Sequence, residues 1–271
     1  AYYYLSLAED IASHTNSNVF TDRCNVNRSF LLATTGNFAQ SLDVLNRIER
    51  NKIDKSMLFD YYSAYEWVYS VWSEYSADDA FSINFKKKEM EYNDSMLMVL
   101  EPSSNEFLYW NGELLARKGD QLEAQKSYEK ALENLEVETR LYACVTCGLA
   151  FAHKRQGNLK EYERYLIMSA ISDTTCPLKE NLSMQELAMF LYQSSEPDIE
   201  RANKYINYSM EDAIFYNNRL RMLEIGQKLT PIVNSYQEKW IEKNKVLVKY
   251  VYFITFLIIL LMVSMFFIFR Q

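Results

Sequence analysis

The stretch FLYWNGELLARKGDQLEAQKSYEKALENL, residues 107–135, indicates how the whole chain folds. A Gly-Asp pair divides it into two halves, and each half has apolar or small residues at helical spacing. These residues are Leu108, Gly112 and Leu115 in the first half, and Ala124, Tyr128 and Ala131 in the second. Small residues let two helices approach closely, while larger ones fill the space around the contact. The stretch therefore predicts a hairpin of two packed helices with a turn at Gly119-Asp120.

Similar turn signals recur along the chain at intervals of about forty residues or twice that length. They are Gly36-Asn37, Gly119-Asp120, Gly157-Asn158, a weaker turn at residues 76–79, and a turn at residues 194–198 in which Pro197 ends one helix and Asp198 caps the next. A constant interval is the signature of stacked repeats, in which each unit buries its apolar face on its neighbours.

The hairpin of residues 107–135 resembles a tetratricopeptide repeat (TPR). The following units preserve the pattern in part, with Leu149 and Ala150 in one and Ala202 and Ile206 in the next, although Tyr162 stands where a small residue is expected. The resemblance implies an all-α fold, a TPR-like α-solenoid of helical hairpins. The alternative is an irregular helical bundle whose turns are spaced alike by coincidence.

Composition agrees with a helical protein and excludes several other classes. The 271 residues include only 6 Gly and 4 Pro, which argues against collagen-like, low-complexity and turn-rich all-β chains. The formal net charge of -7 argues against binding nucleic acid through bulk positive charge.

The C-terminal residues 250–269, YVYFITFLIILLMVSMFFIF, form an uncharged stretch that predicts one transmembrane helix. The alternative, a buried core helix, seldom stays apolar on every face for such a length. The sequence before it contains no Gly or Pro from residue 232 onward, so a rigid helix is expected to run from the repeats into the membrane. We therefore divide the chain into a repeat domain (1–230), a juxtamembrane helix (231–249) and a transmembrane helix (250–269).

Nearly continuous helix is expected over residues 199–240, with a break at Thr230-Pro231, since a residue before proline avoids helical geometry.

Orientation in the membrane depends on which flanking charges are counted. Four lysines precede the predicted span and only Arg270 follows it, which places the repeats in the cytoplasm by the positive-inside rule. The chain opens at Ala1 within a helical pattern, so we interpret its N-terminus as a cut. A basic segment after Gln271 would reverse the sign and place the repeats in the periplasm.

The order of TPR-like repeats, the segment ANKYINYSMEDAIFYNNRLRMLEIGQKLTPIVNSYQEK (residues 202–239) and one membrane span resembles a SusR-like family of single-pass regulators from Bacteroidetes. This resemblance implies a periplasmic sensor of helical repeats in the inner membrane, a cytoplasmic coiled coil and a helix-turn-helix output that controls transcription. The 271 residues contain no such DNA-binding domain, so contact with DNA would require a further C-terminal domain.

No catalytic apparatus is visible, and we expect neither enzyme activity nor a cofactor. The chain has two histidines and lacks HExxH, GxSxG, P-loop and dinucleotide-binding motifs. Cys144 and Cys147, with His153 and Cys176, permit a zinc or redox site on paper. Their position inside a helical pattern instead favours tight packing, and no metal site is predicted.

Binding on the concave face of the repeats is the better functional hypothesis. In the register set by Gly119 and Gly157, the first helices present aromatic and charged residues together with Cys144 and Cys147. The predicted ligand-binding residues are Arg23, Phe30, Tyr109, Glu113, Phe151 and Lys154. Aromatic planes can stack on sugar rings or peptide side chains, and charges can orient a ligand. The alternative is that Tyr109 and Phe151 only pack between repeats.

Two functions remain open. The first is a membrane-bound sensor, expected to dimerise, that binds a protein, peptide or oligosaccharide and passes the signal through the span. The second is a tail-anchored TPR scaffold that holds a protein partner at the membrane lipid, with its repeats in the cytoplasm.

Overall fold

The computed structural model describes residues 2–15, 18–76, 80–176 and 182–270, and in these residues the fold is all-α. The described part has twelve α-helices and one short 3-10 helix: α1 (Tyr2–Thr15), α2 (Asn18–Thr34), α3 (Phe38–Leu45), η1 (Lys55–Met57), α4 (Leu58–Tyr75), α5 (Ser82–Leu97), α6 (Asn105–Lys118), α7 (Gln121–Leu132), α8 (Arg140–Arg155), α9 (Leu159–Thr175), α10 (Leu182–Gln193), α11 (Ile199–Phe215) and α12 (Arg219–Arg270).

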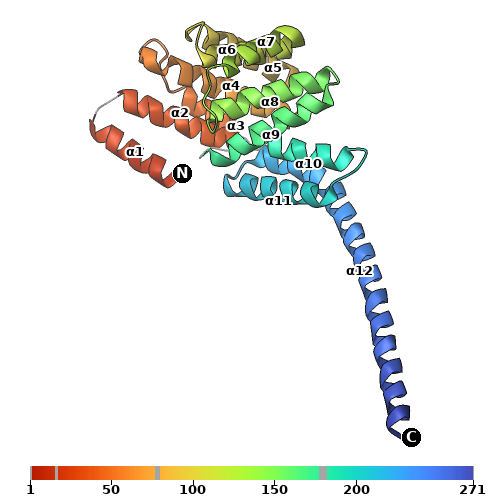
Figure 1. The fold of residues 1–271 in the computed structure, drawn as a ribbon. Helices are drawn as coiled ribbons and strands as arrows, with labels where there is room; N and C mark the ends of the chain where they lie inside the picture. The colour runs from red at the N-terminus through yellow and green to blue at the C-terminus, as the bar shows by residue number, and fades with distance from the viewer. Residues whose placement is uncertain (1, 16–17, 77–79, 177–181, 271) are drawn as a thin grey trace.

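Consecutive helices pack as hairpins, and the hairpins stack into a curved array from which α12 leaves as a long rod (Figure 1). The pairs are α2 with α3, α4 with α5, α6 with α7, α8 with α9, and α10 with α11, which also packs on α12. This arrangement confirms the predicted TPR-like solenoid. The predicted turn at residues 76–79 lies between α4 and α5, with residues 77–79 outside the described part.

The glycine turns have one common geometry. Gly36, Gly119 and Gly157 have φ values of +79°, +92° and +76°, a region that glycine adopts without steric cost. In each turn the amide of the following residue donates to the carbonyl five residues back, which closes the end of the first helix. The next helix then starts from Asn37, Asp120 or Asn158.

Tyr128 fills the centre of the best-defined repeat and is 2% exposed. A Cβ atom added at Gly112 on α6 would lie 2.5 Å from the Tyr128 ring, and one at Gly148 on α8 would lie 2.8 Å from it. Gly112 therefore makes room for the tyrosine ring. The Tyr128 ring thus packs between Gly112 of its own hairpin and Gly148 of the next hairpin.

The root of α12, which we define as residues 219–235, belongs to two apolar cores at once. Leu220 is 5% exposed and packs in the N-terminal core with residues of α2, α3 and α4. Ile225 and Ile232 are fully buried in the C-terminal core with residues of α9, α10 and α11. In addition, the Cδ atom of Arg219 lies 3.6 Å from the position of a Cβ on Gly36. The array thus curls far enough for its first and last repeats to hold the same helix.

Two expectations for residues 199–240 were wrong. The helix expected there is interrupted after Phe215, where Asn217 adopts φ +51°, and α12 begins at Arg219. The Asn218 amide donates to the Ala213 carbonyl, which repeats the pattern of the glycine turns. Asparagine tolerates this left-handed geometry better than most residues, so Asn217-Asn218 stands in for a Gly-Asn turn.

The expected break at Thr230-Pro231 is also absent, because α12 continues through Pro231. A proline inside a helix costs about 3 kcal/mol. Full burial of the isoleucines on either side, Ile225 and Ile232, contributes roughly 3–6 kcal/mol for the pair. Packing therefore outweighs the local penalty and keeps the helix whole.

α12 stands apart from the repeats beyond Lys239, whose Nζ atom still lies 3.8 Å from Glu200 Oε1 of α11 (Figure 1). We call residues 236–249 the stem. Among the described residues α12 is the one helix long and apolar enough to cross a membrane, and the side chains of its apolar window are exposed. It is therefore a candidate single membrane span, joined to the repeats without a flexible linker.

We predict that Gly112→Ala lowers the melting temperature of the detergent-solubilised chain by several degrees, because a methyl group would overlap the Tyr128 ring. Gly226→Ala is the matched control, since no atom lies within 4 Å of its added Cβ and alanine favours a helix by about 1 kcal/mol. It should raise the melting temperature slightly. Equal effects of the two substitutions in a circular-dichroism melt would contradict the packing of Tyr128.

Candidate functional site

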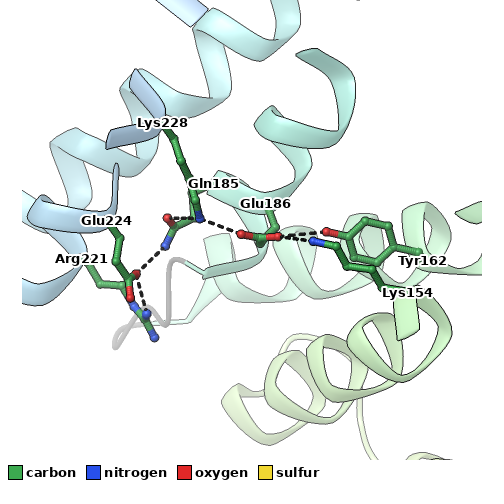
Figure 2. A network of polar contacts seen from close by, with 7 residues as sticks. All are labelled: Lys154, Tyr162, Gln185, Glu186, Arg221, Glu224 and Lys228. Atoms are coloured by element: carbon green, nitrogen blue, oxygen red, sulfur yellow. Dashed lines mark hydrogen bonds and ion pairs between the residues drawn. The ribbon is translucent and has the colours of Figure 1, made fainter. Parts of the chain in front are cut away.

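A chain of polar contacts links the repeats to the root of α12 (Figure 2). Glu186 on α10 is its centre. Its Oε2 atom accepts from Lys154 Nζ of α8 at 3.0 Å and from the Tyr162 hydroxyl of α9 at 3.1 Å. Its Oε1 atom accepts from Lys228 Nζ of α12 at 2.6 Å. One carboxylate thus ties three repeat helices to the long helix, and we call these four residues with their neighbours the root network.

The network extends along the root through Gln185, which is fully buried. Its Oε1 atom accepts from Lys228 Nζ at 2.8 Å, and its Nε2 atom donates to Glu224 Oε2 at 3.4 Å. Glu224 in turn accepts from Arg221 at 2.8 Å. Two adjacent polar residues of α10, Gln185 and Glu186, therefore contact Glu224 and Lys228, which lie one turn apart on α12.

The charge balance of the network favours the ionised carboxylate. Burial by itself would raise the pKa of Glu186, but the hydrogen bonds and charges of Lys228 and Lys154 outweigh it and lower that pKa below its usual range. The Glu186 side chain is 12% exposed, so it is shielded from solvent far more than ordinary surface ion pairs are.

A second polar cluster lies between the α4–α5 and α6–α7 hairpins. The guanidinium of Arg117 contacts Glu66 at 3.0 Å, Glu89 at 3.1 Å and Glu113 at 3.8 Å. Glu113 also accepts from the Tyr128 hydroxyl at 2.6 Å. Desolvation of the buried carboxyl raises the pKa of Glu66 to about 7 despite the attraction of Arg117, and repulsion by Glu89 and Glu113 adds to the rise. One arginine therefore faces three carboxyl groups in a buried junction.

A polar groove of about 470 Å³ runs along α11 beside the start of the stem. It is lined by Glu200, Asn203, Lys204, Asn207, Tyr208, Glu211 and Tyr236. Tyr236 belongs to α12, whereas the other residues come from one face of α11. A molecule in this groove would contact the last repeat and the long helix together.

The residues predicted to bind a ligand fall into separate groups. Tyr109 and Glu113 lie on α6 around Tyr128, with the two tyrosine ring centroids 6.2 Å apart. Phe151 and Lys154 lie on α8, and the Lys154 ammonium sits over the Phe151 and Tyr162 rings at 5.6 and 4.9 Å.

The two earlier candidates lie on α2. Arg23 is exposed, while Phe30 packs against the N-terminal core. Ligand binding by these six residues stays a prediction.

The structure adds residues that the sequence pattern did not single out. These residues of the root network are Gln185, Glu186, Arg221, Glu224 and Lys228, of which Gln185 and Lys228 are 43 positions apart. Nothing local in the sequence marks such a pairing. The Asn217-Asn218 pair was the available signal, because recognising it as a turn would have placed α12 beside α10 and α11.

The cysteines are thiols in positions suited to packing. Cys144 and Cys147 lie inside α8 as expected, with Cys147 buried and Cys144 half-buried, and neither Cys24 nor Cys176 forms a disulfide in the described residues. That part of the chain also holds no group of three or more His, Cys, Asp or Glu side chains arranged for a metal ion.

Stacked helical hairpins with glycine turns and small residues at the helix contacts define a TPR domain, a scaffold that typically has no catalytic role. The family model described as the SusR N-terminal TPR domain matches residues 1–227, and the chain belongs to this family. Among solved structures, the chain is similar to PilW, described as a widely conserved type IV pilus biogenesis factor. The two are 15% identical, the match covers 81% of this chain and 93% of PilW, and the TM-score is 0.44. No curated protein matches the chain.

We predict that Glu186 and Lys228 are energetically coupled. In a double-mutant cycle with Glu186→Gln and Lys228→Met, the coupling free energy should be about 1–3 kcal/mol, because each single substitution removes the shielded charge that faces the other residue at 2.6 Å. The exposed Glu49–Lys52 pair, with a 2.7 Å contact, is the control and should give about 0.5 kcal/mol or less. Similar values for both pairs in chemical denaturation would show that the root network is not shielded.

The Arg117 cluster should make stability depend on pH. The pKa of Glu66 is higher in the folded chain than its ordinary value of 4.5, so its contribution to stability is complete below that value and is lost as the pH rises through about 7. Melting temperatures measured from pH 5 to pH 8 should fall accordingly. Glu66→Gln should flatten the profile, whereas Glu133→Gln, at an exposed position, should leave it unchanged. An unaltered slope in the Glu66 variant would contradict this assignment.

Proposed function

We propose that this chain is the sensing and interaction part of a membrane-bound regulator. In this proposal the repeats bind a ligand or protein partner, and the resulting change in the array is passed through α12 across the membrane. The output is control of transcription by a DNA-binding domain outside these 271 residues. The chain itself has no enzymatic role and needs no cofactor.

The single observation that carries the proposal is the continuity of α12 from its root to the candidate span. Its root contacts both the N-terminal and the C-terminal cores through Leu220 and Ile225, so a change of curvature in the array must move it. A partner in the groove beside Tyr236, or on the face around Lys154, would contact elements that directly hold this helix. A ligand shifts such an equilibrium only by its different affinity for the two arrangements.

The proposal divides the chain into the repeat domain (1–230), a juxtamembrane helix (231–249) and an inner-membrane span (250–269), with the repeats in the periplasm and two copies acting together. A tail-anchored scaffold is the second candidate, and the lysines of the stem favour it because they would place the repeats in the cytoplasm. A scaffold needs the anchor but not a rigid stem, which gives a direct way to distinguish the two.

We predict that inserting Gly-Gly-Ser between Val246 and Leu247 abolishes regulation of the genes that depend on the full-length protein in its native host. The insertion interrupts the helix with flexible residues but leaves the repeats and the anchor intact. Transcript levels and membrane fractionation measure the two properties separately.

An insertion of seven alanines at the same place is the matched control. Seven residues complete nearly two helical turns, so this insertion lengthens the stem while almost preserving its phase. It should retain regulation, at least in part. Normal regulation by the Gly-Gly-Ser variant would contradict the relay and leave the scaffold as the better account.

A further inference from the structure

A small cavity of about 280 Å³ opens beside the α4–α5 hairpin, away from the root network. It is lined by Arg50, Tyr61, Tyr62, Glu91, Tyr92 and Ser95. Arg50 comes from the segment between α3 and η1, Tyr61 and Tyr62 from α4, and the remaining residues from α5. The lining thus combines three phenol rings with one positive and one negative side chain.

The aromatic wall of this cavity is held in place before anything binds. Tyr92 stacks on Tyr65 with ring centroids 4.6 Å apart and planes inclined by 8°. Tyr61 and Tyr62 meet edge to face at 5.4 Å, and they are 7% and 6% exposed. A preorganised wall lowers the entropy cost of binding.

The two charged residues retain binding capacity. Arg50 donates from Nε to the Tyr62 hydroxyl at 2.8 Å and lies over the Tyr62 ring, so among the described residues its two terminal nitrogens have no protein acceptor. Glu91 accepts from Lys88 at Oε2, at 2.7 Å, which leaves Oε1 for another donor. Although both line one cavity, Arg50 and Glu91 do not form an ion pair with each other in the described part of the chain.

We propose that this cavity binds a small zwitterion of the amino-acid type. Its carboxylate would pair with the terminal nitrogens of Arg50, a geometry in which guanidinium forms two parallel hydrogen bonds. Its ammonium group would reach Glu91 Oε1, beside Tyr92 on the same helix. The volume is at the low end for ligand pockets and suits a single small molecule.

Neither a simple anion nor a simple cation satisfies the site as well. An anion at Arg50 would meet the carboxylate of Glu91, whose charge Lys88 offsets in part, and a cation at Glu91 would meet the guanidinium of Arg50 and the ammonium of Lys88. A zwitterion places its negative group at Arg50 and its positive group at Glu91, so both contacts are attractive. This inference stands apart from the proposed relay, since it concerns binding by the α4–α5 hairpin and not transmission through α12.

Isothermal titration of the full chain in detergent micelles tests the site. The probes are the twenty standard amino acids, with phenylacetate and phenethylamine as analogues of phenylalanine that carry one charge each. At least one amino acid should bind with a dissociation constant in the millimolar range or tighter. If phenylalanine binds, each analogue should bind at least tenfold more weakly. If another amino acid binds, its own deaminated and decarboxylated analogues replace these two.

Two variants assign the two charges. Arg50→Gln should weaken amino-acid binding at least tenfold and leave binding of the amine analogue unchanged. Glu91→Gln should also weaken amino-acid binding at least tenfold, but it should leave binding of the carboxylate analogue unchanged. The exposed neighbours Lys52→Gln and Glu49→Gln are matched controls and should bind as the native chain does, which also shows that a lost charge alone has no effect. Failure of all twenty amino acids to bind, equal binding of a single-charge analogue, or unaltered binding by both variants would overturn the proposal.

Discussion

The apolar contacts that hold the root of α12 are the constraint on which the other features of this molecule depend. Leu220 is packed in the N-terminal core, and Ile225 and Ile232 are buried in the C-terminal core. Because helices of a solenoid usually contact only their neighbours, one helix shared by the first and last repeats restricts the curvature of the whole array. The same helix carries the candidate membrane span, so the position of that span follows from the repeats.

The polar contacts of the root network restrict the rotation of the root of α12 about its own axis. Burial alone would tolerate rotation of the root about its axis, since the hydrophobic effect is not directional. Lys228 and Glu224 limit that rotation because they must reach Glu186 and Gln185 on α10. Networks of this kind have a large desolvation cost, so we attribute to the root network a role in orientation more than in net stability. Lys154 extends the same contacts to α8, one of the faces predicted from sequence to bind a partner.

Local sequence signals predicted the repeat architecture but not the packing of α12 against both the first and the last repeats. The turns at Gly119 and Gly157 and the packing of Tyr128 followed from residues close together in the chain. The turn at Asn217 was missed because asparagine is a weaker signal than glycine for left-handed backbone.

Long-range effects account for the remaining differences. A helix break was predicted at Pro231 because the cost of a proline inside a helix can be read from the sequence. The compensating burial of Ile225 and Ile232 depends on helices that are distant in the sequence. The cavity beside Tyr61 and Tyr92 joins residues about thirty positions apart, which only the α4–α5 packing brings together.

The most direct test of this account is the distance distribution between the repeats and the stem in the membrane-embedded chain. Spin labels at the exposed positions Lys160 on α9 and Lys243 on the stem, introduced after replacement of the native cysteines, would report it by double electron–electron resonance. If the root fixes α12 to the array, the distribution is narrow, and it broadens when Ile225 and Ile232 are both changed to alanine. A broad distribution in the otherwise native chain would contradict the central claim, since it would show that the stem moves independently of the repeats.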